Sequence, residues 1–257
     1  MTLWVRFSDR GAGGFGVLEG ASIAVFTGEM FGSPVATGEV VALEAVRLLA
    51  PVRPVRFIGL WNNFHALAAK LGAAVPTGPL YFLKSPGSLL DPDGEIRPPA
   101  GYAGRIVFEG ELGIVIGRTC RAVDEATAAA AIFGYTCVND VTALDLLEAD
   151  PSFAQWARAK GCDGFGPVGP AIATGLDWRT LRIRTLLNGR ERQNYPADDM
   201  ILPPARIVSL ISAEMTLHPG DLIACGTSVG VLPMRAGMVV EVAIEGIGVL
   251  RNTVAAG

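Results

Sequence analysis

The sequence predicts an α+β fold that is mainly β, a mixed β-sheet with short flanking helices and a small N-terminal unit. The 257 residues include 32 glycines and 17 prolines without any period, which is typical of many turns and short strands rather than of a helix bundle. From Tyr81 onward, most apolar runs are short and are bounded by glycine or proline, as expected for strands. The length fits one large domain with a smaller appendage.

Residues 1–54 are expected to form the small N-terminal domain, and residues 55–257 the larger one. The boundary is placed at Pro51-Val-Arg-Pro54, a proline-bounded run typical of an extended connection. The elements expected before it are strands at Leu3–Phe7 and Ser22–Phe26, a glycine-rich loop at Gly11–Gly14, and a helix at Glu39–Ala50.

The larger domain is expected to alternate many strands with a few short helices. The expected strands are Val55–Leu60, Tyr81–Lys84, Arg105–Gly117, Phe133–Val138, Val168–Thr174, Arg182–Leu187, Asp221–Cys225, Val239–Ile244 and Gly248–Asn252. The expected helices are an alanine-rich one that Asp124 caps and that runs through Ile132, and two short ones at Thr142–Leu147 and Ala205–Ser212.

Charge and hydropathy exclude several classes of protein. The 21 basic and 25 acidic residues give a net charge of −4, and no run of lysine or arginine exceeds two residues, so we expect no nucleic-acid partner. No apolar stretch approaches the ~18 residues of a membrane span, and charged residues near the start argue against a signal peptide. We therefore expect a soluble, cytoplasmic protein without a membrane partner.

The sequence contains only two histidines, His65 and His218, which nearly excludes a zinc site built on histidines. Any bound metal must then be held by carboxylates. Oxygen ligands favour hard cations such as Mg²⁺ and Mn²⁺, with Ca²⁺ possible in a crystal.

Two glutamates interrupt the apolar run Arg105–Gly117. Because side chains alternate along a strand, Glu109 and Glu111 are expected on one face, ~7 Å apart, with the small Gly110 opposite. Two carboxylates in apolar surroundings repel each other and resist ionisation, and a divalent cation would remove that penalty. The alternative is a solvent-facing strand with two surface acids.

Four further features could contribute to the same site. Asp140 comes at the end of the expected strand that begins at Phe133 and offers a third carboxylate, or it caps a following helix. Lys160 could bind a substrate carboxylate or an enolate oxygen, or be an ordinary solvated lysine. The Gly226-Thr227 loop follows a strand and could bind an anion through backbone N–H groups, or be a simple turn. His65 could contribute to the site, or be a structural histidine.

In order along the chain, several motifs resemble those of the fumarylacetoacetate hydrolase (FAH) family. The motifs are Phe108-Glu-Gly-Glu-Leu112, Gly134-Tyr-Thr-Cys-Val-Asn-Asp140, Ala159-Lys160, Gly166-Pro-Val-Gly-Pro170, Pro219-Gly-Asp221, Gly226-Thr227 and Ile244-Glu-Gly-Ile-Gly248. The resemblance covers roughly Tyr81 to Val254. It is nearest to members that act as 2-hydroxyhepta-2,4-diene-1,7-dioate isomerase or resemble fumarylpyruvate hydrolase.

The resemblance implies an FAH-type mixed β-sheet roll, a homodimer, and a Mg²⁺ or Mn²⁺ site. By position, Glu109, Glu111 and Asp140 are similar to the metal ligands of the family. Lys160 is similar to its substrate-contacting lysine, and Gly226 with Thr227 to its carboxylate-binding loop. His65 matches, in its spacing after Gly59, the histidine of a lid segment, which here spans about residues 59–75. The resemblance therefore implies that His65 and Lys160 are catalytic.

The chain departs from the family pattern at Trp61-Asn62, where the family has Asn-Tyr, and at two further positions. Hydrolytic members carry a glutamate three residues after the lid histidine, where this chain has Ala68, and the family often has an arginine where this chain has Leu144. Loss of a general base typically costs ~10²–10⁴ in rate, so cleavage by water is less secure than metal binding.

The resemblance implies a metal-dependent enzyme that acts on a small 2-oxo or dicarbonyl acid, dicarboxylate-like in size, through a metal-bound enolate. An isomerase or C–C bond hydrolase of aromatic-compound catabolism is the leading hypothesis. The alternatives are an oxaloacetate-type decarboxylase or tautomerase, with lyase activity, and a catalytically weakened member that binds metal and carboxylate but lacks the lid glutamate.

Overall fold

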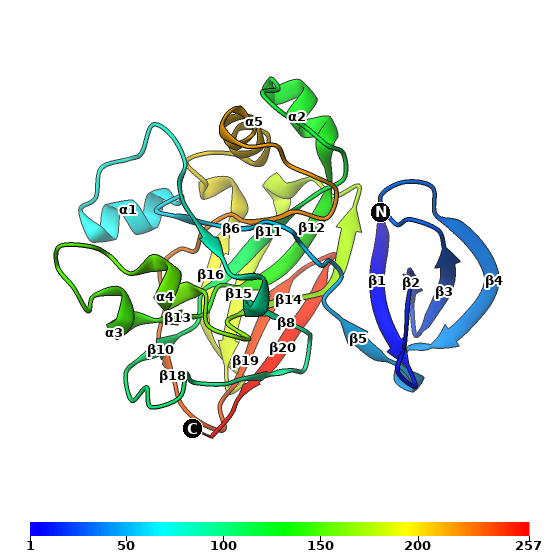
Figure 1. Ribbon diagram of the computed structural model, residues 1–257, viewed down its shortest axis with the longest axis horizontal. Helices are drawn as coiled ribbons and strands as arrows, with labels where there is room; N and C mark the ends of the chain where they lie inside the picture. The colour runs from blue at the N-terminus through cyan, green and yellow to red at the C-terminus, as the bar shows by residue number, and fades with distance from the viewer. Residues whose placement is uncertain (257) are drawn as a thin grey trace.

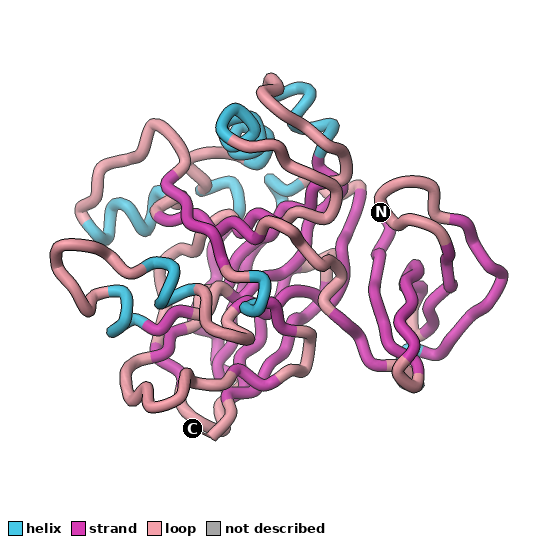
Figure 2. Tube along the Cα trace, viewed as in Figure 1, coloured by secondary structure: helices cyan, strands magenta, loops and turns pink. Residues whose placement is uncertain are grey.

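The computed structural model describes residues 1–256 and is dominated by β-strands, with short helices around them (Figures 1 and 2). The N-terminal strands stand to one side of the main body in Figure 1, and the C-terminus lies at the lower edge of that body. This architecture confirms the predicted fold class, mainly β with short flanking helices.

The largest sheet has twelve strands and runs through both parts of the molecule. Its hydrogen-bonded order is β4-β3-β2-β1-β14-β12-β11-β17-β6-β7, with β5 added beside β1 and β8 beside β14. In chain order its strands are β1 Thr2–Asp9, β2 Ala12–Glu19, β3 Ser22–Thr27, β4 Val35–Ala42, β5 Arg47–Leu49, β6 Phe57–Trp61, β7 Leu80–Lys84, β8 Leu89–Leu90, β11 Gly110–Ile116, β12 Ile132–Asn139, β14 Gly166–Thr174 and β17 Leu222–Ala224.

Two smaller sheets complete the main body. A five-stranded sheet has the order β16-β15-β19-β20-β9, and a three-stranded sheet the order β13-β10-β18. Their strands are β9 Glu95–Ile96, β10 Ile106–Val107, β13 Thr142–Ala143, β15 Arg182–Leu187, β16 Arg190–Pro196, β18 Pro233–Met234, β19 Val239–Ile244 and β20 Gly248–Val254.

The helices are short and lie outside the sheets. They are α1 His65–Leu71, α2 Glu125–Ala131, α3 Leu144–Leu147, α4 Trp156–Lys160 and α5 Pro204–Glu214, with 3₁₀ turns η1 Leu43–Ala45, η2 Pro86–Ser88, η3 Trp178–Thr180 and η4 Ala197–Asp199. The predicted cap of α2 is confirmed, because the Asp124 carboxylate accepts the Thr127 N–H at 2.8 Å. None of the helices among residues 1–256 combines the length and the apolar character that crossing a membrane requires.

The main core lies where the large sheet, the five-stranded sheet and α5 meet. Every residue of β11 is buried, as expected for a strand covered on both faces. Leu112, Ile114 and Ile116 share a core cluster with Ile183 of β15 and Ile207 of α5. This burial fixes the start of β11, where the acidic residues lie.

Two N-terminal predictions are wrong. The segment Glu39–Ala50 is not a helix, because it continues β4, passes through η1 and forms β5 beside β1. The run at Gly11–Gly14 is not a loop, because most of it belongs to β2. A Cβ atom on Gly14 would lie 2.7 Å from the Phe7 ring, so glycine there allows two strands to pack closely rather than marking a turn.

The long strand expected at Arg105–Gly117 is interrupted. It is divided into β10 and β11, with Phe108 and Glu109 between them. The Glu109 backbone N–H donates to the Asn139 side chain at 3.0 Å, and its carbonyl accepts the Asp140 N–H at 2.8 Å. At this interruption, hydrogen bonds of the Glu109 backbone therefore connect it to the end of β12 and to Asp140. The strand β16, which contains Gln193, was not predicted.

Candidate active site

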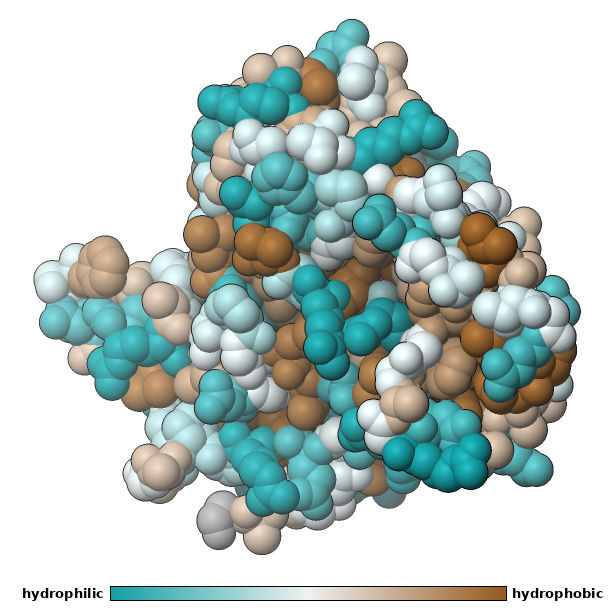
Figure 3. All heavy atoms as spheres, turned by 45° about the vertical axis from the view of Figure 1, so that its right-hand side comes forward, coloured by the Kyte–Doolittle hydropathy of each residue, from teal (hydrophilic) through white to brown (hydrophobic). Residues whose placement is uncertain are grey.

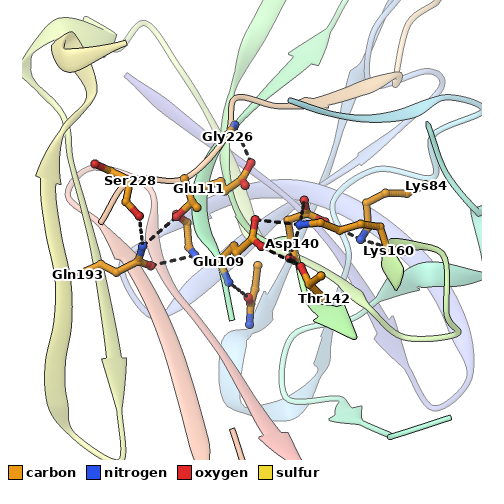
Figure 4. Close-up of polar contacts among 12 residues, drawn as sticks. Lys84, Glu109, Glu111, Asp140, Thr142, Lys160, Gln193, Gly226 and Ser228 are labelled. Carbon is orange, nitrogen blue, oxygen red and sulfur yellow. Dashed lines mark hydrogen bonds and ion pairs between the residues drawn. The ribbon is translucent and has the colours of Figure 1, made fainter. Parts of the chain in front are cut away.

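Three carboxylates converge where β11 begins and β12 ends. These strands are antiparallel neighbours, and Glu111 lies opposite Val138 in their register. Glu109 immediately precedes β11 and Asp140 immediately follows β12. One carboxylate oxygen from each of Glu109, Glu111 and Asp140 lies within 4.8 Å of the others, and Figure 4 shows the three side chains turned toward one another.

Two buried lysines neutralise much of this negative charge. The Lys160 ammonium lies 2.6 Å from an Asp140 oxygen and 2.8 Å from a Glu109 oxygen. The Lys84 ammonium lies 2.6 Å from the other Asp140 oxygen and donates at 2.6 Å to the Lys160 carbonyl. The side chains of Lys84 and Asp140 are fully buried, so this ion pair is shielded from water. Asp140 is therefore held between two cations.

The environments of the carboxyl groups separate their acidities. Burial alone would raise the pKa of Asp140, but the charges of Lys160 and Lys84 outweigh it and lower the pKa below its usual value. Burial, followed by the charges of Asp140 and Glu109, raises the pKa of Glu111 well above its usual value. Without a further cation, Glu111 thus retains its proton more readily than Asp140.

The two lysines respond in opposite directions. Burial lowers the pKa of Lys84, and the charge of Asp140 offsets only part of this effect. Burial would also lower the pKa of Lys160, but the charges of Asp140, Glu109 and Glu111 outweigh it and raise the pKa. Lys160 is therefore a firmly charged ammonium at the centre of the cluster.

One oxygen of Glu111 lacks a partner. Its Oε2 accepts the Gly226 N–H at 2.8 Å, whereas its Oε1 is buried without a hydrogen bond among residues 1–256. Buried carboxylate oxygens are costly unless they are paired or coordinate a metal. An unpaired oxygen within a three-carboxylate cluster fits a hard divalent cation, for which oxygen ligands are preferred. Glu109, Glu111 and Asp140 are the residues that could hold it.

The Gly226-Thr227 loop lies beside the acids. Gly226 has φ of +90°, a conformation that suits glycine, and a Cβ atom there would lie 3.2 Å from the Leu60 carbonyl. The Thr227 hydroxyl donates to the Gly110 carbonyl at 3.1 Å. The loop is thereby tied to the backbone that carries Glu109 and Glu111.

The side chain of His65 makes no hydrogen bond or ion pair with the three acids. His65 is the first residue of α1, and its exposed side chain makes no hydrogen bond or ion pair with residues 1–256. Ala68 is buried on the same helix. Leu144 begins α3 and is partly buried.

Two site residues were missed from the sequence. Lys84 was included in an apolar strand without a role, although its alternation with Phe82 was a usable signal that both face the same side. Gln193 lies on the unpredicted β16, where its carbonyl oxygen accepts the Gly110 N–H at 3.1 Å and its amide donates to the Thr227 hydroxyl at 2.8 Å. Figure 4 shows this amide bridging toward Ser228 at the edge of the cluster.

Comparison with known proteins accounts for nearly the whole chain. Residues 56–255 match the family model described as fumarylacetoacetate (FAA) hydrolase C-terminal. Residues 3–51 match a model described as Rv2993c-like, N-terminal. The chain is 45% identical over 227 residues to protein Rv2993c of Mycobacterium tuberculosis, which covers 87% of this chain and 84% of that protein.

Solved structures show the same fold. One is described as 2-hydroxyhepta-2,4-diene-1,7-dioate isomerase from Mycobacterium marinum, with a TM-score of 0.90, 39% identity, and coverage of 99% of this chain and 98% of that chain. Another is described as 5-carboxymethyl-2-hydroxymuconate delta-isomerase from Mycobacterium smegmatis, with a TM-score of 0.89, 38% identity and 99% coverage of both chains.

Proposed function

The chain belongs to the fumarylacetoacetate hydrolase family, and from this premise we propose that it is a metal-dependent enzyme acting on a small 2-oxo or dicarbonyl acid. The reaction we propose is isomerisation or C–C bond hydrolysis in the catabolism of aromatic compounds. The observation that supports this most directly is the unpaired, buried Oε1 of Glu111 within the three-carboxylate cluster.

In this proposal Glu109, Glu111 and Asp140 hold one Mg²⁺ or Mn²⁺ ion. When bound, the dication supplies a Lewis acid that stabilises the negative charge developing on the oxygens of the acid as a C–H or C–C bond breaks. The oxygen-only donor set and the burial of Glu111 and Asp140 support this assignment.

Lys160 and the Gly226-Thr227 loop are proposed to bind the substrate. The Lys160 ammonium is fixed by Asp140 and Glu109, so it presents a preorganised positive charge to an enolate or carboxylate oxygen. The Gly226 N–H holds the loop beside Glu111, and the loop is proposed to hold the carboxylate end of the acid. A homodimer is part of the same proposal.

His65 is proposed to move the proton. In an isomerisation a proton leaves one carbon and returns to another, so no water is consumed. In hydrolysis, water adds to the acyl carbon as the C–C bond breaks, and a base must accept a proton from that water. Ala68 cannot act as that base, and the two isomerases among the similar structures also support isomerisation as the first choice.

The test is turnover with and without a dication. The purified protein is assayed with a hydroxymuconate-type diene, an acylpyruvate and oxaloacetate, in Mg²⁺, Mn²⁺ or a chelator. We expect metal-dependent turnover of the diene or of the acylpyruvate. Turnover of neither in any condition would overturn the proposal.

Ala68 and Leu144 favour a second candidate, a member that binds metal and carboxylate with little activity. It predicts that Mg²⁺ stabilises the protein and that oxalate, which resembles the carboxylate and keto oxygens, adds stability without turnover of any acid. Decarboxylation or tautomerisation of oxaloacetate would instead favour a third candidate, an oxaloacetate-type decarboxylase or tautomerase.

A further inference from the structure

An aromatic pocket adjoins the acid cluster. It has a volume of about 290 Å³ and is lined by Trp61, Leu80, Tyr81, Phe82 and Trp156. Trp156 stacks on Phe82 with ring centroids 5.1 Å apart and planes 12° apart, and Trp61 packs 6.1 Å from Trp156. Among residues 1–256, no charged side chain lines this pocket. It is therefore a flat-sided apolar space of the size of a single ring or a short conjugated chain.

Strand β7 connects the pocket to the acids. Side chains alternate along a strand, so Leu80, Phe82 and Lys84 share one face. Lys84 contacts Asp140, and Leu80 lines the pocket. Phe82 lies between them, with its ring centroid 5.2 Å from the Lys160 ammonium. The wall of the pocket thus continues directly into the charged cluster.

Two further elements repeat this arrangement. On α4, Trp156 and Lys160 are four residues apart and therefore lie on one face of the helix, the first in the pocket and the second among the acids. On β6, Trp61 lines the pocket, and two residues earlier a Cβ atom on Gly59 would lie 2.5 Å from the Phe82 ring and 3.4 Å from an Asp140 oxygen. The absence of a side chain at Gly59 lets the pocket approach the acids closely.

The charges around the pocket select against a second carboxylate. No lysine or arginine of the described residues lines it, and the Tyr81 hydroxyl on its wall is hydrogen-bonded to Glu214 at 2.5 Å. A carboxylate placed there would lose its water without gaining a cation, and would approach the negative charge of Glu214. An apolar substituent would gain contact with the rings without that penalty.

We propose that this pocket receives a planar, apolar substituent, such as a phenyl ring or an uncharged conjugated chain, on the acid whose 2-oxo end binds at Glu109, Glu111 and Asp140. This inference rests on the proposed function and refines it. Among the acids that the site could accept, it selects those with an apolar tail over those with a second carboxylate.

The test compares tails on a common head. Binding of acetylpyruvate, benzoylpyruvate and fumarylpyruvate is measured by calorimetry in the presence of Mg²⁺, alongside turnover, with oxalate as a probe of the head alone. We expect benzoylpyruvate to bind at least about tenfold more tightly than fumarylpyruvate, a ratio in the range that pocket contacts provide. Equal binding, or tighter binding of fumarylpyruvate, would overturn the inference.

One strand supplies a matched pair of variants. Leu80 and Leu83 are both exposed leucines of β7, 43% and 52% exposed, but they lie on opposite faces and only Leu80 lines the pocket. Leu80→Ala is expected to weaken benzoylpyruvate about tenfold and leave oxalate unchanged, and Leu83→Ala to change neither. Leu80→Arg is expected to favour fumarylpyruvate instead.

The probes separate the two proposals. If oxalate fails to bind with Mg²⁺ present, the proposed function fails at its metal site. If oxalate binds to the parent protein but Leu80→Ala and Leu83→Ala affect benzoylpyruvate equally, the pocket inference alone is wrong.

Discussion

At the scale of single residues, Asp140 organises the charges of the site. Its two oxygens are each 2.6 Å from a lysine ammonium, one from Lys84 and one from Lys160. With both lysines charged and all three carboxylates ionised, the cluster of five side chains carries one net negative charge. It carries none when Glu111 is protonated. A dication would favour the ionised form of Glu111, because its charge compensates for the burial that otherwise opposes ionisation.

Glu111→Gln tests this description. The amide keeps the shape of the side chain but removes the charge, so we expect Mg²⁺ affinity to fall more than about a hundredfold and activity to fall with it. In the parent protein, Mg²⁺ at 100 times its dissociation constant should add about 2.7 kcal/mol to the free energy of unfolding, and the variant should lack this gain. Glu39→Gln, at an exposed position, is the control. Retained Mg²⁺ stabilisation in Glu111→Gln would contradict the assigned ligand.

Lys84→Met tests the buried ion pair. Removing one partner leaves the Asp140 charge buried with only Lys160, so we expect the free energy of unfolding to fall by about 3 kcal/mol. Mg²⁺ should raise the free energy of unfolding of Lys84→Met by more than it raises that of the parent protein, because it replaces the missing positive charge. The measurement is urea unfolding with and without Mg²⁺, and Lys70→Met, an exposed lysine of α1, is the control. An unchanged unfolding midpoint in Lys84→Met would refute the pair's structural role.

Tyr81 gives a pH dependence outside the acid cluster. Its hydrogen bond to Glu214, together with burial and the charge of that carboxylate, raises the pKa of Tyr81 to about 12. The folded protein therefore keeps the phenol protonated at pH values where the unfolded chain has lost the proton. Its contribution to stability is complete below about pH 10 and decreases as the pH rises toward 12. The difference in ultraviolet absorbance between the parent and Tyr81→Phe reports this titration, and Glu214→Gln should lower the pKa.

At the scale of elements, the sequence predicted the parts of the site that depend on the spacing of residues close together in the chain. Glu109 and Glu111 are two residues apart at the start of β11, and their spacing predicted them as neighbours, whereas Asp140, which immediately follows β12, was assigned to them through the family resemblance. Lys84 and Gln193 reach the site only through sheet pairing across many residues, which a local pattern does not encode. Glu39–Ala50 had a helix-like apolar spacing, but pairing with β1 and β3 outweighed it.

The end of α1 depends on a glycine conformation. Gly72 caps the helix with φ of +61°, and its N–H bonds back to the carbonyl groups of the last turn. A Cβ atom there meets no other atom within 4 Å, so Gly72→Ala should cost only the backbone strain, about 1 kcal/mol. Gly78→Ala, also free of contacts but without a positive φ, is the matched control and should change stability little. Equal effects of the two substitutions on urea unfolding would refute this explanation.

At the scale of the whole molecule, the N-terminal strands and the candidate site share one sheet. β1 pairs with β14, β14 with β12, and β12 with β11. Rings reinforce this junction, since Trp4 of β1 packs 6.2 Å from Phe133 of β12, and Phe31 meets Phe133 edge-on at 4.9 Å. Loss of the N-terminal strands would expose the edge of β14, two strands away from Glu111.

This continuity predicts that the whole chain unfolds in one transition that Mg²⁺ raises as a unit. Trp4→Ala removes a half-buried ring from the junction and should cost about 2 kcal/mol, which lowers the single midpoint by several degrees. Phe153→Ala, whose side chain is 69% exposed, should leave the midpoint in place. Scanning calorimetry with and without Mg²⁺ makes the measurement. Two transitions, of which the lower one shifts with Trp4→Ala but not with Mg²⁺, would show that the N-terminal strands unfold independently of the sheet that holds the acids.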